Sequence, residues 1–259
     1  AHKGHKILRR RVAINSGLLP YLLEYKVCLD RKAHPGAIFC WPVGGLSGLA
    51  IAGPTRANFG PDGALDLIVK GTSLGPYVAE IAVFEGAQSV RFTWRTDAAV
   101  VRLTLKEPPD MAALLVSARI WPRGSLGPVE VRLRARPCGL GPPTGRRALT
   151  ALREVRAASG GAAPVMNLDT KKEFWALLYD SALEAAGKSE GPCAFAFQPG
   201  EPSAVAVEVG SDVVEARLTY PVGTRAVKFV LWEFPGLSHE EALSRLEVER
   251  ALEELEKLP

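Results

Sequence analysis

The chain has 259 residues, of which 47% are hydrophobic and 23% charged, with a net charge of +4 and a pI near 8.9. This composition is that of an ordinary globular protein, and it excludes global disorder. No run of about 18 apolar residues escapes interruption by a charge, Pro or Gly, which excludes a membrane-spanning helix. The positive charge is mild, so it matters only where it is concentrated.

The first 17 residues concentrate that charge. No acidic residue precedes Glu24. The basic residues of this arm are Lys3, Lys6, Arg9, Arg10 and Arg11. A basic, acid-poor arm is typical of a segment that binds nucleic acid, and equally of an organellar targeting segment.

Residues 18–140 show the period-two alternation of β-strands. Leu65, Leu67 and Val69 alternate with other side chains, and the same pattern returns near residues 90–94, 101–105 and 129–135. Further apolar runs stand at 25–29, 37–41, 77–84 and 114–121. Short strands joined by turn residues predict an antiparallel meander or β-sandwich.

The pattern changes after Cys138, where Gly and Pro residues are frequent. We predict a linker with one short helix over 141–168, followed by an α+β domain over 169–259. In that domain Thr170 with Glu173 predicts a helix that ends at Gly187, and Ser238 with Glu241 predicts another that runs almost to Pro259. Four strands are expected between the two helices, at residues 193–197, 204–209, 213–220 and 225–234. The predicted fold class is mainly β, an antiparallel β-sandwich followed by an α-β-β-β-β-α unit.

Signatures of cofactors and metals are missing from the sequence. The Gly-rich segment 44–48 lacks the Gly-Lys-Ser/Thr ending of a phosphate loop. The four cysteines, Cys28, Cys40, Cys138 and Cys193, have no paired spacing and are expected to be buried free thiols. We therefore expect no cofactor and no metal site. The absence of an N-x-S/T sequon favours an intracellular location, cytoplasmic or organellar. The scarcity of Asn and Gln gives a thermophile-like composition.

Histidine limits the catalytic options, because the chain has only four. His2 and His5 lie on the basic arm, and His239 follows a helix cap and is expected to be solvated. His34 is the one candidate for a base, with Cys40 as its candidate nucleophile.

Two carboxylates suffice for acid–base chemistry on a sugar. The candidates on strands or loops are Asp62, Asp66, Glu80, Asp97, Glu208 and Glu215. Glu80 and Asp97 are the catalytic candidates we single out, Glu80 because it interrupts an apolar strand where burial would raise its pKa.

The arginine residues form a clearer pattern along the strands than the carboxylates do. If the apolar side chains of the meander face inward, a cationic outer face results. Its members are Arg91, Arg95, Arg102, Arg132, Arg134 and Arg136. With the basic arm, this face predicts a non-catalytic interaction or structural subunit of a larger assembly, which binds protein subunits, RNA or DNA.

The alternative is a carbohydrate-active or carbohydrate-binding β-sandwich protein, resembling a glycoside hydrolase in its paired carboxylates. On this hypothesis Trp41, Trp121 and Trp232 would face the sugar. The sequence leaves open whether the protein is an enzyme, and favours slightly that it is not.

Overall fold

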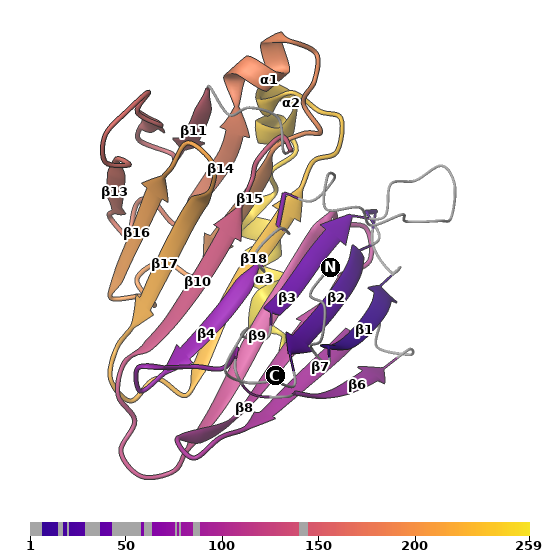
Figure 1. Cartoon of the computed structure of the whole chain (residues 1–259), viewed down its shortest axis with the longest axis vertical. Coiled ribbons are helices and arrows are strands. Elements are labelled where there is room, and N and C mark those ends of the chain that lie inside the picture. Colours follow the sequence, from indigo (N-terminus) through magenta and orange to yellow (C-terminus); the bar gives the residue numbers. More distant parts are fainter. Residues whose placement is uncertain are drawn as a thin grey trace.

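The computed structural model describes residues 7–14, 18–19, 21–28, 37–42, 58–59, 64–75, 77, 79–84, 89–139 and 145–259. These residues form two nine-stranded sheets, A and B, in which every pairing is antiparallel (Figure 1). The mainly β fold predicted from the sequence is therefore confirmed. None of the described helices is long and apolar enough to cross a membrane.

Sheet A contains, in spatial order, β1 (Ile7–Ile14), β2 (Tyr21–Cys28), β3 (Ala37–Pro42), β4 (Leu65–Val69), β10 (Val129–Ala135), β17 (Val214–Tyr220), β16 (Ala204–Val209) and β13 (Val165–Leu168), and β5 (Thr72–Ser73) pairs with β4. Sheet B contains β12 (Glu154–Arg156), β11 (Arg146–Leu149), β14 (Trp175–Asp180), β15 (Cys193–Phe197), β18 (Ala226–Glu233), β9 (Ala113–Pro122), β8 (Ala99–Lys106), β7 (Ser89–Arg95) and β6 (Glu80–Phe84). Each sheet takes strands from both sides of residue 140.

The main core lies between the two sheets. Leu67, Val131 and Leu218 enter it from sheet A, and Phe195 and Leu231 enter it from sheet B. All five side chains are almost completely buried. Burial of apolar surface on this scale is the dominant stabilising term of the fold.

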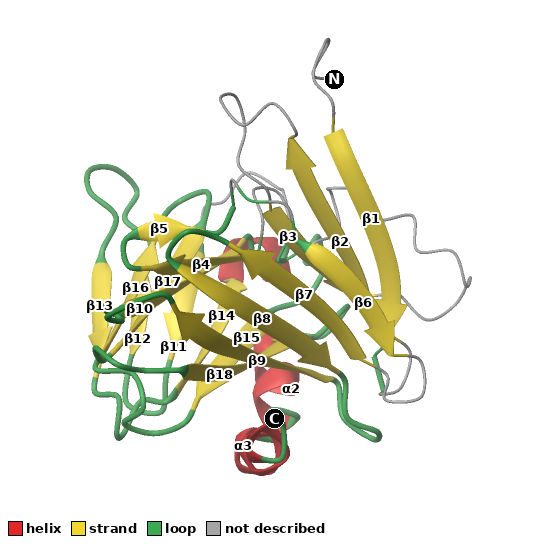
Figure 2. Cartoon of the chain, turned by 90° about the horizontal axis from the view of Figure 1, so that it is seen from below, coloured by secondary structure: helices red, strands yellow, loops and turns green. Residues whose placement is uncertain are grey.

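A third layer covers sheet B alone. The helices α2 (His239–Ser244) and α3 (Val248–Glu256) lie on its outer side, as Figure 2 shows. Leu252 and Leu255 of α3 pack there with Val230 and Trp232 of β18. Lys228 of the same strand donates to the carbonyl oxygens of Leu255, Glu256 and Leu258, which would otherwise lack partners at the end of the helix.

Two of the predicted helices are wrong. Residues 175–180 form strand β14, and only Ser181–Ala185 (α1) is helical. Both faces of β14 are buried, so its apolar residues are continuous and imitate a helical stripe. The short helix expected near 148–155 is instead the hairpin of β11 and β12. Gly187 does adopt a positive φ of 63° just after α1.

The predicted strands between 193 and 234 and the capping box at Ser238 are confirmed. The four strands expected between 193 and 234 are β15 to β18, with ends within one residue of those predicted. Ser238 and Glu241 form the expected capping box. The final helix is broken, because α2 ends at Ser244 and α3 begins at Val248.

Candidate active site

The outer side of sheet A is open and polar. Buried and partly exposed residues alternate along four of its strands, β4, β10, β17 and β16. Every second side chain of these strands therefore points away from the core. We call this surface the open face. Its outward polar side chains are Asp66, Glu130, Arg132, Arg134, Glu208, Glu215, Arg217 and Thr219.

Glu215 is the most strongly held carboxylate of the open face. Its Oε2 accepts a hydrogen bond from Arg134 Nε at 2.9 Å, and its Oε1 accepts one from Arg217 Nε at 2.6 Å. Burial alone would raise the pKa of Glu215, but the two guanidinium groups outweigh it and lower the pKa below 4.5. Glu215 is thus an ionised group at neutral pH and a candidate base.

Asp66 behaves in the opposite way. The Ser73 hydroxyl on β5 donates to its carboxyl group, with both oxygens at 2.9 Å. Burial is the largest influence and raises the pKa of Asp66 above 3.8, although Ser73, Arg132 and Arg134 act to lower it. Asp66 therefore holds its proton more tightly than a free carboxyl group and is a candidate acid.

Strand β10 connects these two carboxyl groups. Arg132 stands opposite Asp66 and Arg134 opposite Glu215 in the sheet register. With ideal sheet spacing, this puts the two Cα atoms about 12 Å apart. Arg134 influences the pKa of both carboxyl groups, so the three share one electrostatic environment. Two carboxyl groups whose pKa values are shifted in opposite directions are the usual composition of an acid–base pair.

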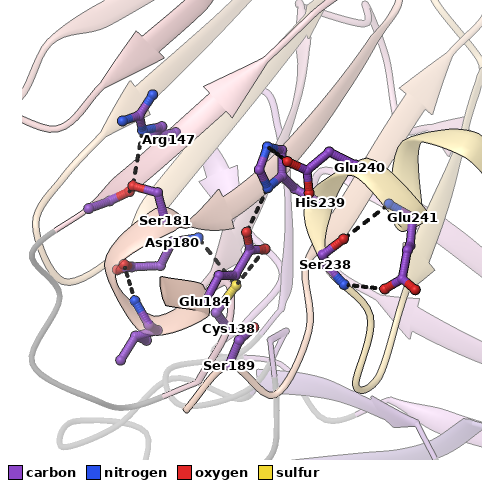
Figure 3. Close-up of polar contacts among 12 residues, drawn as sticks. Cys138, Arg147, Asp180, Ser181, Glu184, Ser189, Ser238, His239, Glu240 and Glu241 are labelled. Atoms are coloured by element: carbon purple, nitrogen blue, oxygen red, sulfur yellow. Dashed lines mark hydrogen bonds and ion pairs between the residues drawn. The ribbon is translucent and has the colours of Figure 1, made fainter. Parts of the chain in front are cut away.

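A second polar cluster lies at the end of the sandwich where α1 and α2 meet (Figures 1 and 3). His239 Nδ1 is 2.6 Å from Glu184 Oε2, and His239 Nε2 is 3.3 Å from Glu240 Oε1. The imidazole stacks on the Tyr179 ring, with centroids 4.1 Å apart and planes 8° apart. The expectation of a solvated His239 is therefore wrong, because this side chain is only 25% exposed and is held on two sides.

Cys138 lies behind Glu184, with its Sγ 4.0 Å from Glu184 Oε1 (Figure 3). Burial raises the pKa of this thiol to about 11, so it is protonated at neutral pH and is a poor nucleophile. Cys193 is also a buried free thiol with a raised pKa, again because of burial. The side chains of Cys28, Cys40 and His34, and with them the predicted Cys–His pair, lie outside the described residues.

Glu233 is a buried acid that the sequence analysis did not consider. Burial raises its pKa well above 4.5, against hydrogen bonds from the Asn58 side chain at 2.6 Å and the backbone of Phe59. Only 1% of the residue is exposed. We therefore assign Glu233 to the interior of the fold and not to a site that meets ligands.

The arginines predicted to share one cationic face are divided between two sheets. Arg91, Arg95 and Arg102 lie on β7 and β8 of sheet B, whereas Arg132 and Arg134 lie on β10 of sheet A. Strand parity shows which side chains of one strand share a face, but it does not show which sheet the strand joins.

Most of these guanidinium groups have partners within the chain. Ion pairs join Arg95 to Glu80, Arg132 to Glu130, Arg134 to Glu215, and Arg136 to Asp212. Arg91 lies 4.5 Å from the centre of the Phe84 ring, and Arg102 lies 5.0 Å from that of Trp121.

The catalytic candidates singled out from the sequence lie away from the open face. Glu80 begins β6 with its side chain 69% exposed, so it is a surface partner of Arg95 and not a buried acid. Asp97 is exposed in the turn between β7 and β8. Asp66, Glu208 and Glu215 were in the wider set, and the fold brings these three to one surface.

Most of the remaining predicted residues, or their side chains, lie outside the part of the chain that the structure describes. Lys3, Lys6 and Asp62 lie outside the described residues, as do the side chains of Arg9, Arg10 and Trp41, while Arg11 is exposed on β1. Trp232 is 2% exposed beneath the helices and cannot meet a sugar, whereas Trp121 is 43% exposed.

Comparison with known proteins identifies the fold. No family model and no curated protein matches the sequence. Two solved bacterial structures, each described as a putative aldose 1-epimerase, do match in structure. The Escherichia coli K12 protein has 11% identity and a TM-score of 0.51, covering 88% of this chain and 100% of its own. The Klebsiella pneumoniae protein has 10% identity and a TM-score of 0.51, covering 100% of this chain and 92% of its own. At this identity the likeness is one of fold.

These findings overturn the leading prediction of a non-catalytic structural subunit that binds an acidic partner or nucleic acid. The similar structures belong to carbohydrate-related proteins. The cationic face on which that prediction rested is split between two sheets and largely neutralised by acidic side chains of the same chain. The carbohydrate alternative agrees better with both observations.

Proposed function

We propose that this chain is a carbohydrate-active protein that binds an aldose on the open face and exchanges protons with it through Asp66 and Glu215. The observation that carries the proposal is the opposite displacement of the two pKa values on one open surface, upward for Asp66 and downward for Glu215. A sandwich fold shared with proteins described as aldose 1-epimerases supports the sugar as substrate.

Interconversion of the two anomers of an aldose needs one base and one acid. The base removes the proton of the C1 hydroxyl group while the acid protonates the ring oxygen, so the bond between C1 and the ring oxygen breaks and an aldehyde forms. Rotation about the C1–C2 bond and the reverse proton transfers then close the ring as the other anomer. The lowered pKa of Glu215 suits it to the first role, and the raised pKa of Asp66 suits it to the second.

Arg134 acts on both groups, by contact with Glu215 and by its charge on Asp66. Its guanidinium donates to Glu215 and keeps that carboxylate ionised, and its charge also reaches Asp66. Ser73 holds the Asp66 carboxyl group in one orientation through contacts of 2.9 Å to both oxygens. Side chains of two strands, Arg134 of β10 and Ser73 of β5, therefore hold the base and the acid, and little rearrangement is needed for proton transfer.

Polarimetry tests the proposal directly. Freshly dissolved α-anomers of aldohexoses should lose their excess rotation faster in the presence of the protein. Asp66→Asn and Glu215→Gln should each lower kcat/KM by about 10²- to 10⁴-fold, because each removes one proton-transfer group. Glu208→Gln is the matched control: it lies on the same face, opposite Glu215 in the register, and should leave the rate near that of the wild type.

The pH dependence gives a second readout. The rate should fall as the pH rises through the pKa of Asp66, because the acid then loses its proton, and fall again in acid as Glu215 becomes protonated. A wild-type protein that accelerates mutarotation of no aldohexose, or full activity in both carboxyl variants, would refute the proposal.

A further inference from the structure

We propose that His239 and Glu240 bind a zinc ion or a similar divalent transition metal, with Glu184 holding the histidine ring in place. One ligand atom from each of the three residues lies within 4.8 Å of the others. This cluster is carried by α1 and α2, whereas Asp66 and Glu215 lie on β4 and β17 of sheet A. The inference does not depend on the proposed sugar chemistry, and it departs from the sequence-based expectation of no metal site.

Distances decide the role of each carboxylate. Zinc binds imidazole nitrogen and carboxylate oxygen at about 2.0–2.2 Å, so two such ligands at a tetrahedral angle are about 3.4 Å apart. His239 Nε2 and Glu240 Oε1 are 3.3 Å apart, which fits shared coordination. His239 Nδ1 and Glu184 Oε2 are 2.6 Å apart, too close for two ligands of one ion but suited to a hydrogen bond.

This arrangement is that of a carboxylate–histidine–metal triad. A metal-binding histidine usually donates its other ring N–H to a carboxylate, which fixes the tautomer and the direction of the coordinating nitrogen. Here Nδ1–H donates to Glu184, which leaves the lone pair of Nε2 on the side of Glu240 (Figure 3). Imidazole and carboxylate together favour zinc and its late transition-metal neighbours over calcium or magnesium.

The surroundings hold the ring and leave the ligand side accessible. Tyr179 stacks against the imidazole, and Cys138 lies against the far oxygen of Glu184. The capping box serves the backbone N–H groups of Ser238 and Glu241. The Glu240 carboxylate accepts hydrogen bonds from its own backbone N–H and from the Ser238 side chain, so zinc would replace these bonds. The Glu240 side chain is 73% exposed, and water from solvent can complete the coordination.

Calorimetric titration of the full chain with ZnCl₂ tests the site. The wild type should bind one zinc ion that His239→Gln does not bind. Glu240→Gln should weaken binding at least tenfold, and Glu184→Gln by about 10- to 100-fold, the loss typical of an orienting carboxylate. The matched control Glu249→Gln, on exposed surface of α3, should bind as the wild type does. Zinc held by other histidines, such as His2 or His5, remains in His239→Gln and is subtracted.

Two further measurements separate ligation from a structural effect. Thermal unfolding should show a rise of the midpoint with added zinc in the wild type and in Glu249→Gln, a smaller rise in the Glu240 and Glu184 variants, and none in His239→Gln. In ¹⁵N spectra of the imidazole, zinc should move the Nε2 resonance while Nδ1 stays protonated. Wild-type binding equal to that of His239→Gln would overturn the site, and coordination through Nδ1 would overturn the roles assigned to the two glutamates.

Discussion

The outer faces of the two sheets differ although their inner faces are alike. Both sheets turn apolar side chains into one shared core, but the outer side of sheet A is open and polar, while β14, β15, β18 and part of β9 in sheet B lie under α2 and α3. β10 therefore alternates between buried and partly exposed residues, whereas all five residues of β15 are buried. The helices shield these strands of sheet B from water, whereas the open face of sheet A carries the proposed site.

The strand β15 shows how the covered sheet is built. Its larger side chains, Phe195 and Phe197, fill the core between the sheets, and its small ones, Ala194 and Ala196, lie on the side of the helices. Small residues there let α3 approach the sheet closely, and large residues opposite fill the wider space between the sheets. β15 therefore keeps a period of two in side-chain size, although polarity no longer marks it.

The largest expected effect comes from putting the same charge on the two outer faces. Ala196→Glu places a carboxyl group under the helices and should destabilise the protein by about 4 kcal/mol or more, or prevent folding. Ala206→Glu on β16 of the open face, opposite Arg217, should change the free energy of unfolding by no more than about 0.5 kcal/mol. Urea denaturation compares the two, and equal losses of stability would contradict the distinction between the faces.

An intermediate effect is expected at Glu173, a carboxyl group that is 2% exposed beside β14. It accepts hydrogen bonds from Arg153 Nε at 3.0 Å, the Thr150 hydroxyl at 2.7 Å and the Asp169 amide at 3.0 Å. Burial alone would raise its pKa, but these partners lower it below 4.5. Glu173→Gln should cost about 2–3 kcal/mol at neutral pH, because part of this buried network loses its partners.

The pH dependence of that effect has a definite sign. A carboxyl group whose pKa is lower in the folded state stabilises the fold above its unfolded pKa, and this stabilisation is lost as the pH falls through its folded pKa. The difference between wild type and Glu173→Gln should therefore shrink between about pH 6 and pH 3. Urea titrations across this range measure it, with the exposed Glu249→Gln variant as the matched control. A difference that stays constant with pH would assign the cost to packing.

The smallest effect on stability is expected on the open face itself. Arg134 is 39% exposed, and Glu215 keeps Arg217 when Arg134 is removed. Arg134→Ala should therefore change the free energy of unfolding by no more than about 1 kcal/mol, as is usual for exposed ion pairs. The same variant should lower the mutarotation rate more than tenfold, because Arg134 acts on both proposed proton-transfer groups. A stability loss as large as that of Ala196→Glu would show that the open face is structural.

The apolar patterns located most strands of both sheets, but they missed β1 and β13 of sheet A and β11, β12 and β14 of sheet B. The patterns identified β4 (Leu65–Val69) and β10 (Val129–Ala135) as strands because one face of each strand meets water and the other face meets the core. Residues 175–180 were assigned to a helix because β14 is buried on both faces, so polarity no longer marks the period. The capping box at Ser238 was correct, since its hydrogen bonds are local, but the break between α2 and α3 follows from packing on sheet B.

The candidate site was only partly visible in the sequence. Asp66 and Glu215 were among six carboxylates that spacing could not rank, and the two placed foremost, Glu80 and Asp97, proved to be exposed. His239 was noticed but expected in solvent, and Glu184 gave no signal because nothing in its local sequence predicts a partner 55 residues away.

By itself, the sequence determined which side chains of a strand share a face, where turns fall, and that the fold is mainly antiparallel β, because these depend on periodicity and local hydrogen bonding. Only the tertiary structure decided that β10 lies between β4 and β17 and so relates Asp66 to Glu215 across 149 positions of the chain. It also decided which arginines meet which acids, and which sheet the helices cover. Strand order and ion pairing are long-range choices, made by how the whole chain buries its apolar surface, and no short window of residues contains them.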